Sequence, residues 1–273
     1  MFVPDRKELH FFGTDLGFKN DRSVETYQKN FDAWQSEPVG GEASVWYLHS
    51  QLAAQEIHDF KPDAKIIIML RNPTEMVYAQ HSQAVYVGRE TITDFEAALD
   101  AEESRRKGKL KTHPLSPPEV FNYSEIARYT EQIKRYVDLF GRDQIHFVIF
   151  DDLKADAETV FEGVLKFLGV STTHNVSLAP RNKNRRFKNK RLHYLVNNPP
   201  PVLRSVIKGL LPSGIFKWTK TKLQKVNTSR RPRDKMSEHV KVRLEAIYRD
   251  EVKTLGEYLG RDLSHWSGQE SGS

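Results

Sequence analysis

Arg71 is the side chain best placed to bind an anion. It directly follows the apolar run of residues 65–70, and Asn72 and Pro73 then open a helical pattern. Asn72 can cap that helix, Pro73 suits its first position, and Glu75 stands where a capping box places its acid. Arg71 would then lie at the carboxyl edge of a strand beside a helix N-terminus, and both features attract anions. The alternative is a surface Arg at an ordinary strand–helix turn.

Two basic runs are further candidates for anion binding. One lies within residues 181–191, and the other includes Arg230, Arg231 and Arg233. Each could instead be a solvated charged loop. Nucleic-acid binding is another alternative for both runs, but no aromatic platform or recognised motif supports it.

Asp151 and Asp152 follow a second apolar run and resemble the acid of a Walker B motif, which would indicate an ATPase or kinase that uses magnesium. That interpretation requires a Walker A loop, and the sequence contains no Gly-x-x-x-x-Gly-Lys-Ser/Thr pattern. The His residues are scattered without metal-ligand spacing. We therefore expect no metal site.

The elements that must position these groups form an α/β pattern. Residues 65–70 are apolar, unbroken and rich in Ile, which predicts a strand buried on both faces of a parallel sheet. Residues 145–150 predict a second buried strand. Together with the helical patterns between and after them, these runs predict a parallel sheet with helical cover. Helices are expected at residues 23–34, 51–58, 73–82, 94–107, 124–140, 155–168 and 237–259.

The composition is that of a folded protein. The 273 residues are 38% hydrophobic, which suffices for a packed core, and carry a net charge of +6. That charge suits an anionic ligand but is too small to indicate nucleic acid by itself. The chain has no cysteine, which excludes disulfides and thiolate catalysis. No apolar run approaches the roughly 20 residues of a membrane span, and no signal segment is evident. We therefore expect a cytoplasmic protein.

The stretch from about residue 171 to 235 differs from the rest because it is Pro-rich and basic. It predicts an irregular segment that wraps over a single domain, residues 1–273, rather than a second domain. Residues 202–218 within it are apolar with scattered Lys and Arg. Packing against the core is the simpler interpretation, and a membrane-surface role is the alternative.

Several stretches, in order along the chain, resemble sulfotransferases that use 3′-phosphoadenosine 5′-phosphosulfate (PAPS), in particular bacterial members and the sulfotransferase domains of heparan sulfate enzymes. PDAKIIIMLRNP, residues 62–73, resembles the segment that binds the 3′-phosphate. The resemblance covers nearly the whole chain and implies a P-loop-NTPase-like parallel sheet with helices on both faces. The other similar stretches are KELHFF (7–12), GEASVWYL (41–48), residues 129–152, FLGV (167–170) and LGRDLSHW (259–266).

The resemblance implies metal-free, in-line transfer of a sulfuryl group from PAPS to a hydroxyl or amine of a glycan, lipid or small-molecule acceptor. It implies that Glu8 is the general base and that Lys7 and His10 orient the acceptor or balance charge. Without the resemblance, these three would be a solvated loop with a packed His ring. Arg71 would hold the 3′-phosphate through its planar fork. In the heparan sulfate group a basic loop before the last helix assists, and its residues here would be Asn227, Arg230 and Arg231.

The sequence departs from the family pattern in two places. Ala79 replaces a Ser that would donate to the 3′-phosphate, a bond worth about 1.5–3 kcal/mol; His81 or Ser82 could compensate. The strand, Gly-rich loop and helix that open the family, roughly 30 residues, have no counterpart. We therefore expect an N-terminally truncated and impaired sulfotransferase. A nucleotide-binding pseudoenzyme and a basic nucleic-acid-binding domain are the alternatives, and the oligomeric state is not predicted.

Overall fold

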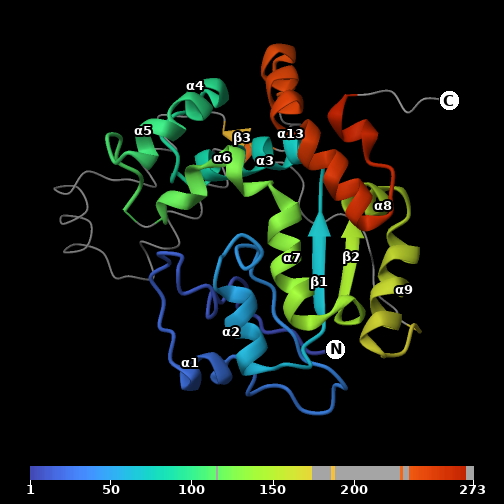
Figure 1. Ribbon diagram of the computed structural model, residues 1–273. Coiled ribbons are helices and arrows are strands. Elements are labelled where there is room, and N and C mark those ends of the chain that lie inside the picture. The colour runs from blue at the N-terminus through green and yellow to red at the C-terminus, as the bar shows by residue number, and fades with distance from the viewer. Residues whose placement is uncertain (115, 174–185, 188–227, 230–233, 269–273) are drawn as a thin grey trace, which may run out of the picture.

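Two parallel strands, β1 (Ile66–Leu70) and β2 (Ile145–Ile149), lie side by side at the centre of the computed structural model (Figure 1). The structure describes residues 1–114, 116–173, 186–187, 228–229 and 234–268. Ile66 pairs with Ile145 and Leu70 with Ile149, so both strands end at the same edge. A second, antiparallel pair joins β3 (Arg186–Phe187) to β4 (Thr228–Ser229).

Helices cover both faces of the central strands, as the predicted α/β fold requires. On one face Ile68, Leu70 and Ile149 enter a core that they share with α7 (Tyr129–Phe140). On the other face Val148 is buried. There the ring of His146 stacks on that of Phe167 in α9 (Ala157–Leu168), with ring centroids 5.2 Å apart.

One prediction about β1 was wrong. Ile68 and Leu70 are buried, but Ile67 and Met69 are 39% and 56% exposed, so the strand is buried on one face only. The register places these two side chains on the same face as His146, and α9 covers β2 there rather than β1. An apolar run does not report how far a neighbouring helix extends across a sheet.

The helices predicted at residues 51–58, 155–168 and 237–259 match within two residues. The helix predicted at residues 23–34 ends at Lys29, the one predicted at residues 73–82 continues to Tyr86, and the helix Phe150–Ala155 was not predicted. Residues 94–107 and 124–140 each form two helices instead of one. In the second case the amide of Gln132 donates to the carbonyls of Glu125 and Ile126, satisfying the end of the first helix and allowing the chain to turn. The remaining helices in the described part are α1 (Val24–Lys29), α2 (Ala53–Phe60), α3 (Pro73–Tyr86), α4 (Phe95–Asp100), α5 (Glu102–Arg106), α6 (Tyr123–Ile126), α8 (Phe150–Ala155) and α13 (Glu238–Leu259), with 3-10 turns η1 (Pro118–Phe121), η2 (Arg142–Gln144) and η3 (Ser264–Ser267).

Two helices frame the carboxyl edge of the strands. α3 starts there, and Asn72 caps it as predicted, its side chain accepting from the N–H of Thr74 at 3.0 Å. α13 lies near the tips of both strands in Figure 1 and packs against α3 and α7. Gly260 ends α13 in the left-handed conformation, φ 64°. No helix in the described part of the chain combines the length and apolar content needed to cross a bilayer.

Candidate functional site

Arg71 lies at the carboxyl edge of β1, where the sequence placed it. Its Nε and Nη2 donate to one carboxylate oxygen of Glu75, at 3.0 and 2.8 Å. Its guanidinium lies over the ring of Phe150, 4.8 Å from the centroid, at the end of the neighbouring strand. Glu75 was predicted to close a capping box. It does not do so, because its carboxylate binds Arg71 instead. The Arg71 side chain remains 32% exposed and its planar fork has a fixed orientation.

Arg71 and the N-terminus of α3 form a place where an anion could bind. The fork is suited to phosphate oxygens, and it stands beside the N-terminus of α3, which favours negative charge. Among the described residues, Nη1 of Arg71 has no hydrogen-bond partner, whereas Glu75 occupies the other side of the fork. An anion bound here would compete with that carboxylate.

The two side chains that could have compensated for Ala79 are engaged elsewhere. The hydroxyl of Ser82 donates to the carbonyl of Tyr78 at 2.8 Å, one turn back along α3. His81 is 3% exposed, its Nε2 lies 2.9 Å from the carbonyl of Ile92, and burial lowers its pKa. Both groups already have hydrogen-bond partners, so the proposed compensation for Ala79 finds no support in the structure.

Asp151 and Asp152 hold the C-terminal segment against the strand edge. The indole of Trp266 donates to Asp151 at 2.6 Å, and Arg261 forms a two-pronged ion pair with Asp152. Burial raises the pKa of Asp151, but hydrogen bonds from Lys154, Trp266 and His265 outweigh it and bring the pKa to about 2. Both acids have structural partners, which argues against the Walker B interpretation.

Glu8 and His10 lie together in a short irregular segment near the N-terminus, residues 7–12, here called the Glu8–His10 turn. Both have positive φ, 56° and 49°, a conformation that residues other than Gly rarely adopt. One carboxylate oxygen of Glu8, Oε2, accepts from the N–H of Val45 at 3.0 Å and lies 3.8 Å from Nε2 of His10. The other oxygen, Oε1, has no hydrogen-bond partner among the described residues, and the side chain is 41% exposed.

The pKa values of Glu8 and His10 differ from those of the same residues in an exposed loop. Burial raises the pKa of Glu8, against the lowering effects of the Val45 N–H and of the Lys7 charge. Burial lowers the pKa of His10 to about 4, and the charges of Arg22, Arg6 and Arg89 act in the same direction. His10 is therefore neutral at pH 7. It suits an orienting role and not the charge-balancing role that we also considered.

The two halves of the predicted site lie toward opposite ends of α3. Arg71 precedes the first residue of this helix, whereas Arg89, which follows the helix, is close enough to act on His10. A helix of 14 residues is about 21 Å long. The structure thus brings Glu8, His10 and Lys7 together and places Arg71 apart from them.

Sequence reasoning missed four side chains that hold the Glu8–His10 turn. Asn20 donates to the carbonyls of Leu9 and His10, at 3.0 and 2.6 Å. The other three belong to the GEASVWYL stretch, to which we had given no role. The signal available was an acid followed two and five residues later by hydroxyl side chains. These three residues are Glu42, Ser44 and Tyr47.

Asn227, Arg230 and Arg231 lie outside the described residues, so their predicted place in the nucleotide site stays a prediction. The pairing of β3 with β4 places Arg186 of the first basic run opposite Ser229, the residue before the second run. Sequence reasoning had treated these runs separately.

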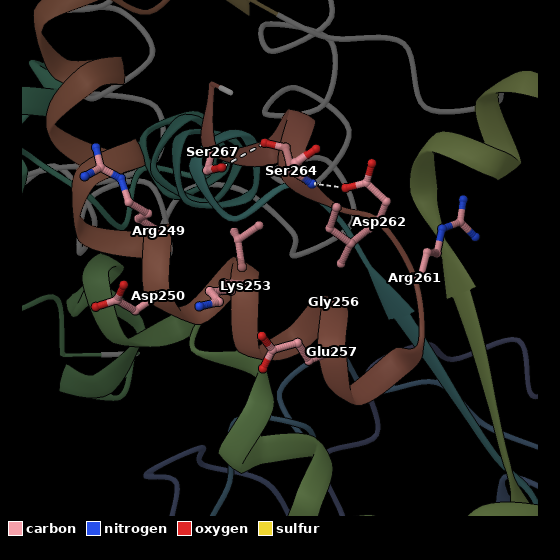
Figure 2. A pocket seen from close by; sticks show the side chains of 11 residues that line it. Arg249, Asp250, Lys253, Gly256, Glu257, Arg261, Asp262, Ser264 and Ser267 are labelled. Carbon is pink, nitrogen blue, oxygen red and sulfur yellow. Dashed lines mark hydrogen bonds between the residues drawn. The ribbon is translucent and has the colours of Figure 1, made fainter. Parts of the chain in front are cut away.

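A hollow of about 310 Å³ lies between α13 and the chain that follows it (Figure 2). Its lining mixes cations such as Arg249 and Lys253 with acids such as Asp250 and Glu257. None of the residues predicted to act in catalysis lines it. We therefore do not assign the reaction to this hollow.

Comparison with known proteins decides the family. A family model of the sulfotransferase domain matches residues 45–256, which is more than half of the chain. The chain belongs to the sulfotransferase family. The match contains Arg71 but begins after Glu8 and His10, so it does not bear on the roles of those two residues.

This sulfotransferase is similar to a crystal structure of a sulfotransferase from Alicyclobacillus acidocaldarius, with a TM-score of 0.69 and 26% identity, over 97% of this chain and 87% of that one. It is also 28% identical over 168 residues to the bifunctional heparan sulfate N-deacetylase/N-sulfotransferase 1 of Caenorhabditis elegans. It is 26% identical over 144 residues to enzyme 4 of that name from Mus musculus. The alignments cover 59% and 50% of this chain but only 18% and 15% of those relatives.

These findings confirm the predicted family and the α/β fold, and they support sulfuryl transfer as the chemistry of that family. They give no support to a pseudoenzyme or a nucleic-acid-binding domain as the function. They likewise give no support to the predicted truncation of this sulfotransferase.

Proposed function

We propose that this sulfotransferase moves a sulfuryl group from PAPS to a hydroxyl or amine, with Glu8 as general base and Arg71 as the 3′-phosphate clamp. The observation that carries the proposal is the state of Glu8. Its carboxylate has a pKa raised by burial, one oxygen fixed by a backbone N–H, and the other oxygen without a described partner. A base is most effective when its pKa lies closer to the working pH than that of an exposed carboxylate.

In the proposed reaction, Glu8 takes the proton of the acceptor as the acceptor oxygen or nitrogen attacks sulfur in line with the departing phosphate. The free Oε1 is the atom that receives the proton. The imidazole of His10, neutral at pH 7, stacks on Phe18 with the ring centroids 4.0 Å apart and offers a fixed polar edge to the acceptor. Lys7 lies near enough to favour ionised Glu8.

On the donor side, Arg71 would bind the 3′-phosphate, and Asn227, Arg230 and Arg231 would assist. PAPS supplies the activated sulfuryl group as a substrate. The sequence contains no Gly-x-x-x-x-Gly-Lys-Ser/Thr loop for the phosphosulfate, so the groups that hold that end are not assigned. A single domain, a cytoplasmic location and metal-free chemistry stay predictions.

We infer that the acceptor is a glycan amine or hydroxyl. The relatives that support this are named as heparan sulfate N-sulfotransferases, although they share only a small part of their length with this chain. A lipid or a small phenol is the alternative acceptor, and a panel of acceptors would distinguish it from a glycan.

The test is transfer of radiolabelled sulfate from PAPS to three acceptors: a glucosamine-containing glycan, a glycolipid and a small phenol. We expect label in the glycan. Label confined to the phenol or the lipid would overturn the acceptor class. No label in any acceptor, from protein that binds adenosine 3′,5′-bisphosphate (PAP), would overturn the proposed reaction.

A further inference from the structure

The turn that carries Glu8 is held in an unfavourable backbone conformation. Glu8 and His10 are the two residues other than Gly with positive φ in the described part of the chain, and they are separated by one residue. Such conformations persist only where surrounding contacts determine them, and they cluster at functional sites. The contacts that determine this one are therefore informative.

The segment of residues 42–47 makes most of these contacts. The N–H of Glu8 donates to the carbonyl of Ala43 at 3.2 Å, and the N–H of Val45 donates to the Glu8 carboxylate. Between these two residues, the hydroxyl of Ser44 accepts from the N–H of His10 at 3.1 Å. The backbone and the carboxylate of Glu8 are thus both clamped by one short stretch.

A second hydroxyl continues the clamp along the chain. The phenol oxygen of Tyr47 accepts from the N–H of Phe11 at 2.9 Å and from the N–H of Phe12 at 3.3 Å. Three consecutive backbone N–H groups, those of residues 10–12, therefore donate to side-chain hydroxyls. A hydroxyl can serve as such an acceptor while its own proton goes to another group.

That other group is Glu42 for both hydroxyls. Ser44 donates to its Oε2 at 2.9 Å, and Tyr47 donates to its Oε1 at 2.6 Å. Only an ionised carboxylate accepts at both oxygens without a competing proton. Each hydroxyl proton is thereby directed to Glu42, and each hydroxyl lone pair is left facing the backbone.

We propose that Glu42 is a positioning residue for the base Glu8. It acts through the hydroxyls of Ser44 and Tyr47, which fix the turn and with it the direction of the Glu8 carboxylate. Glu42 touches no reacting atom in this scheme. The inference rests on the proposed function, because it assumes that Glu8 is the base.

The network also sets the proton affinity of Glu8. The Val45 N–H lowers the pKa of Glu8 and is within reach only while the turn keeps its shape. If Glu42 or Tyr47 is altered, the turn relaxes toward ordinary backbone angles and that hydrogen bond is lost. In Tyr47→Phe, which keeps the charge of Glu42, the pKa of Glu8 would then rise, and a larger fraction of the enzyme would be protonated and inactive at a given pH. In Glu42→Gln the lost repulsion between Glu42 and Glu8 acts in the opposite direction.

The experiment compares Glu42→Gln, Tyr47→Phe, Glu8→Gln and the double variant Glu8→Gln with Glu42→Gln. Glu102→Gln is the matched control, because Glu102 is a buried carboxylate that likewise accepts from a Ser hydroxyl and also from a backbone N–H. The readouts are kcat and its pH profile with the acceptor found in the panel, KM for PAPS, and hydrogen exchange at the amides of Phe11 and Phe12.

We expect Glu42→Gln and Tyr47→Phe to lower kcat by about 10- to 100-fold, since misplacement of a catalytic group has effects of that size. KM for PAPS should stay within about twofold. In Tyr47→Phe, which keeps the charge of Glu42, the acidic limb of the pH profile should move to higher pH. Exchange at Phe11 and Phe12 should become faster. In the Glu8→Gln background, Glu42→Gln should have no further effect on kcat, because both changes act through the same group.

Two results would overturn the inference while leaving the proposed function intact. One is a loss of activity in Glu42→Gln that adds in full to the loss in Glu8→Gln. The other is a wild-type pH profile and kcat in both single network variants. By contrast, full activity in Glu8→Gln would overturn the proposed function itself. A variant that fails to fold is recognised by its thermal transition, and Tyr47→Phe, the more conservative change, then provides the test.

Discussion

Glu75 and a bound phosphate would compete for Arg71. Substitutions of Arg71 and of Glu75 should therefore change the affinity for PAP in opposite directions. Arg71→Ala removes the charged donor, and a hydrogen bond to a charged group contributes about 1.5–3 kcal/mol, so the affinity for PAP should fall by about 10- to 150-fold. Glu75→Gln removes the competing anion. The pair is partly exposed, with side chains 32% and 48% accessible. Breaking such a pair costs about 0.2–1 kcal/mol, so PAP should bind about 1.4- to fivefold more tightly.

Isothermal titration calorimetry with PAP measures both effects. Thermal unfolding is the control, and Glu75→Gln should change the midpoint by no more than about 2 °C, because an exposed pair contributes little to stability. Gln is nearly isosteric with Glu, so the position of the Arg71 fork over Phe150 should be retained. If Arg71→Ala left PAP affinity unchanged, or if Glu75→Gln weakened binding, the assignment of Arg71 to the phosphate would be wrong.

Three further predictions test other parts of the structure. Ala79→Ser should restore a donor to the 3′-phosphate segment and increase PAP affinity about tenfold in the same calorimetric assay; an unchanged affinity would place this position outside the nucleotide site. Glu90→Gln should destabilise the fold by about 3–5 kcal/mol in urea unfolding, because it leaves the buried charge of Arg105 without its partner, and a loss below about 1 kcal/mol would show that the pair is hydrated. The pKa of His10 is lowered by burial from 6.5 to about 4, so the unfolded chain binds more protons than the folded chain between these values. The free energy of unfolding should therefore not depend on His10 above about pH 6.5, and it should fall as pH decreases toward 4, by at most about 1.4 kcal/mol per pH unit. In His10→Gln the slope of the free energy of unfolding against pH should be smaller. An equal slope in both proteins would mean that His10 is solvated.

The parts of the fold that follow from local chemistry could be predicted from the sequence. The apolar run before Arg71 and the Asn72–Pro73 cap determine where β1 ends and α3 begins, and both boundaries were predicted within one residue. The break between α6 and α7 could not be predicted in this way. Apolar periodicity continues through it, and the Gln132 amide that stabilises it acts from the following helix.

The candidate site shows the same division. Arg71 could be placed because strand and helix signals meet at it. The partner of Arg71 could not be predicted, because Glu75, four residues further along the chain, can either cap the helix or pair with a cation. The left-handed turn at Glu8 and His10 had no local signal, since neither residue is Gly or Asn. It depends on hydroxyls more than 30 residues away in the chain.

The central claim is that Glu8 is the base for sulfuryl transfer. The most direct test measures turnover of radiolabelled sulfate by the wild type and Glu8→Gln, together with PAP affinity for both. Positioned general bases contribute about 10²- to 10⁴-fold. We expect a loss of that size in Glu8→Gln with PAP affinity unchanged. Turnover by Glu8→Gln at the wild-type rate would contradict it.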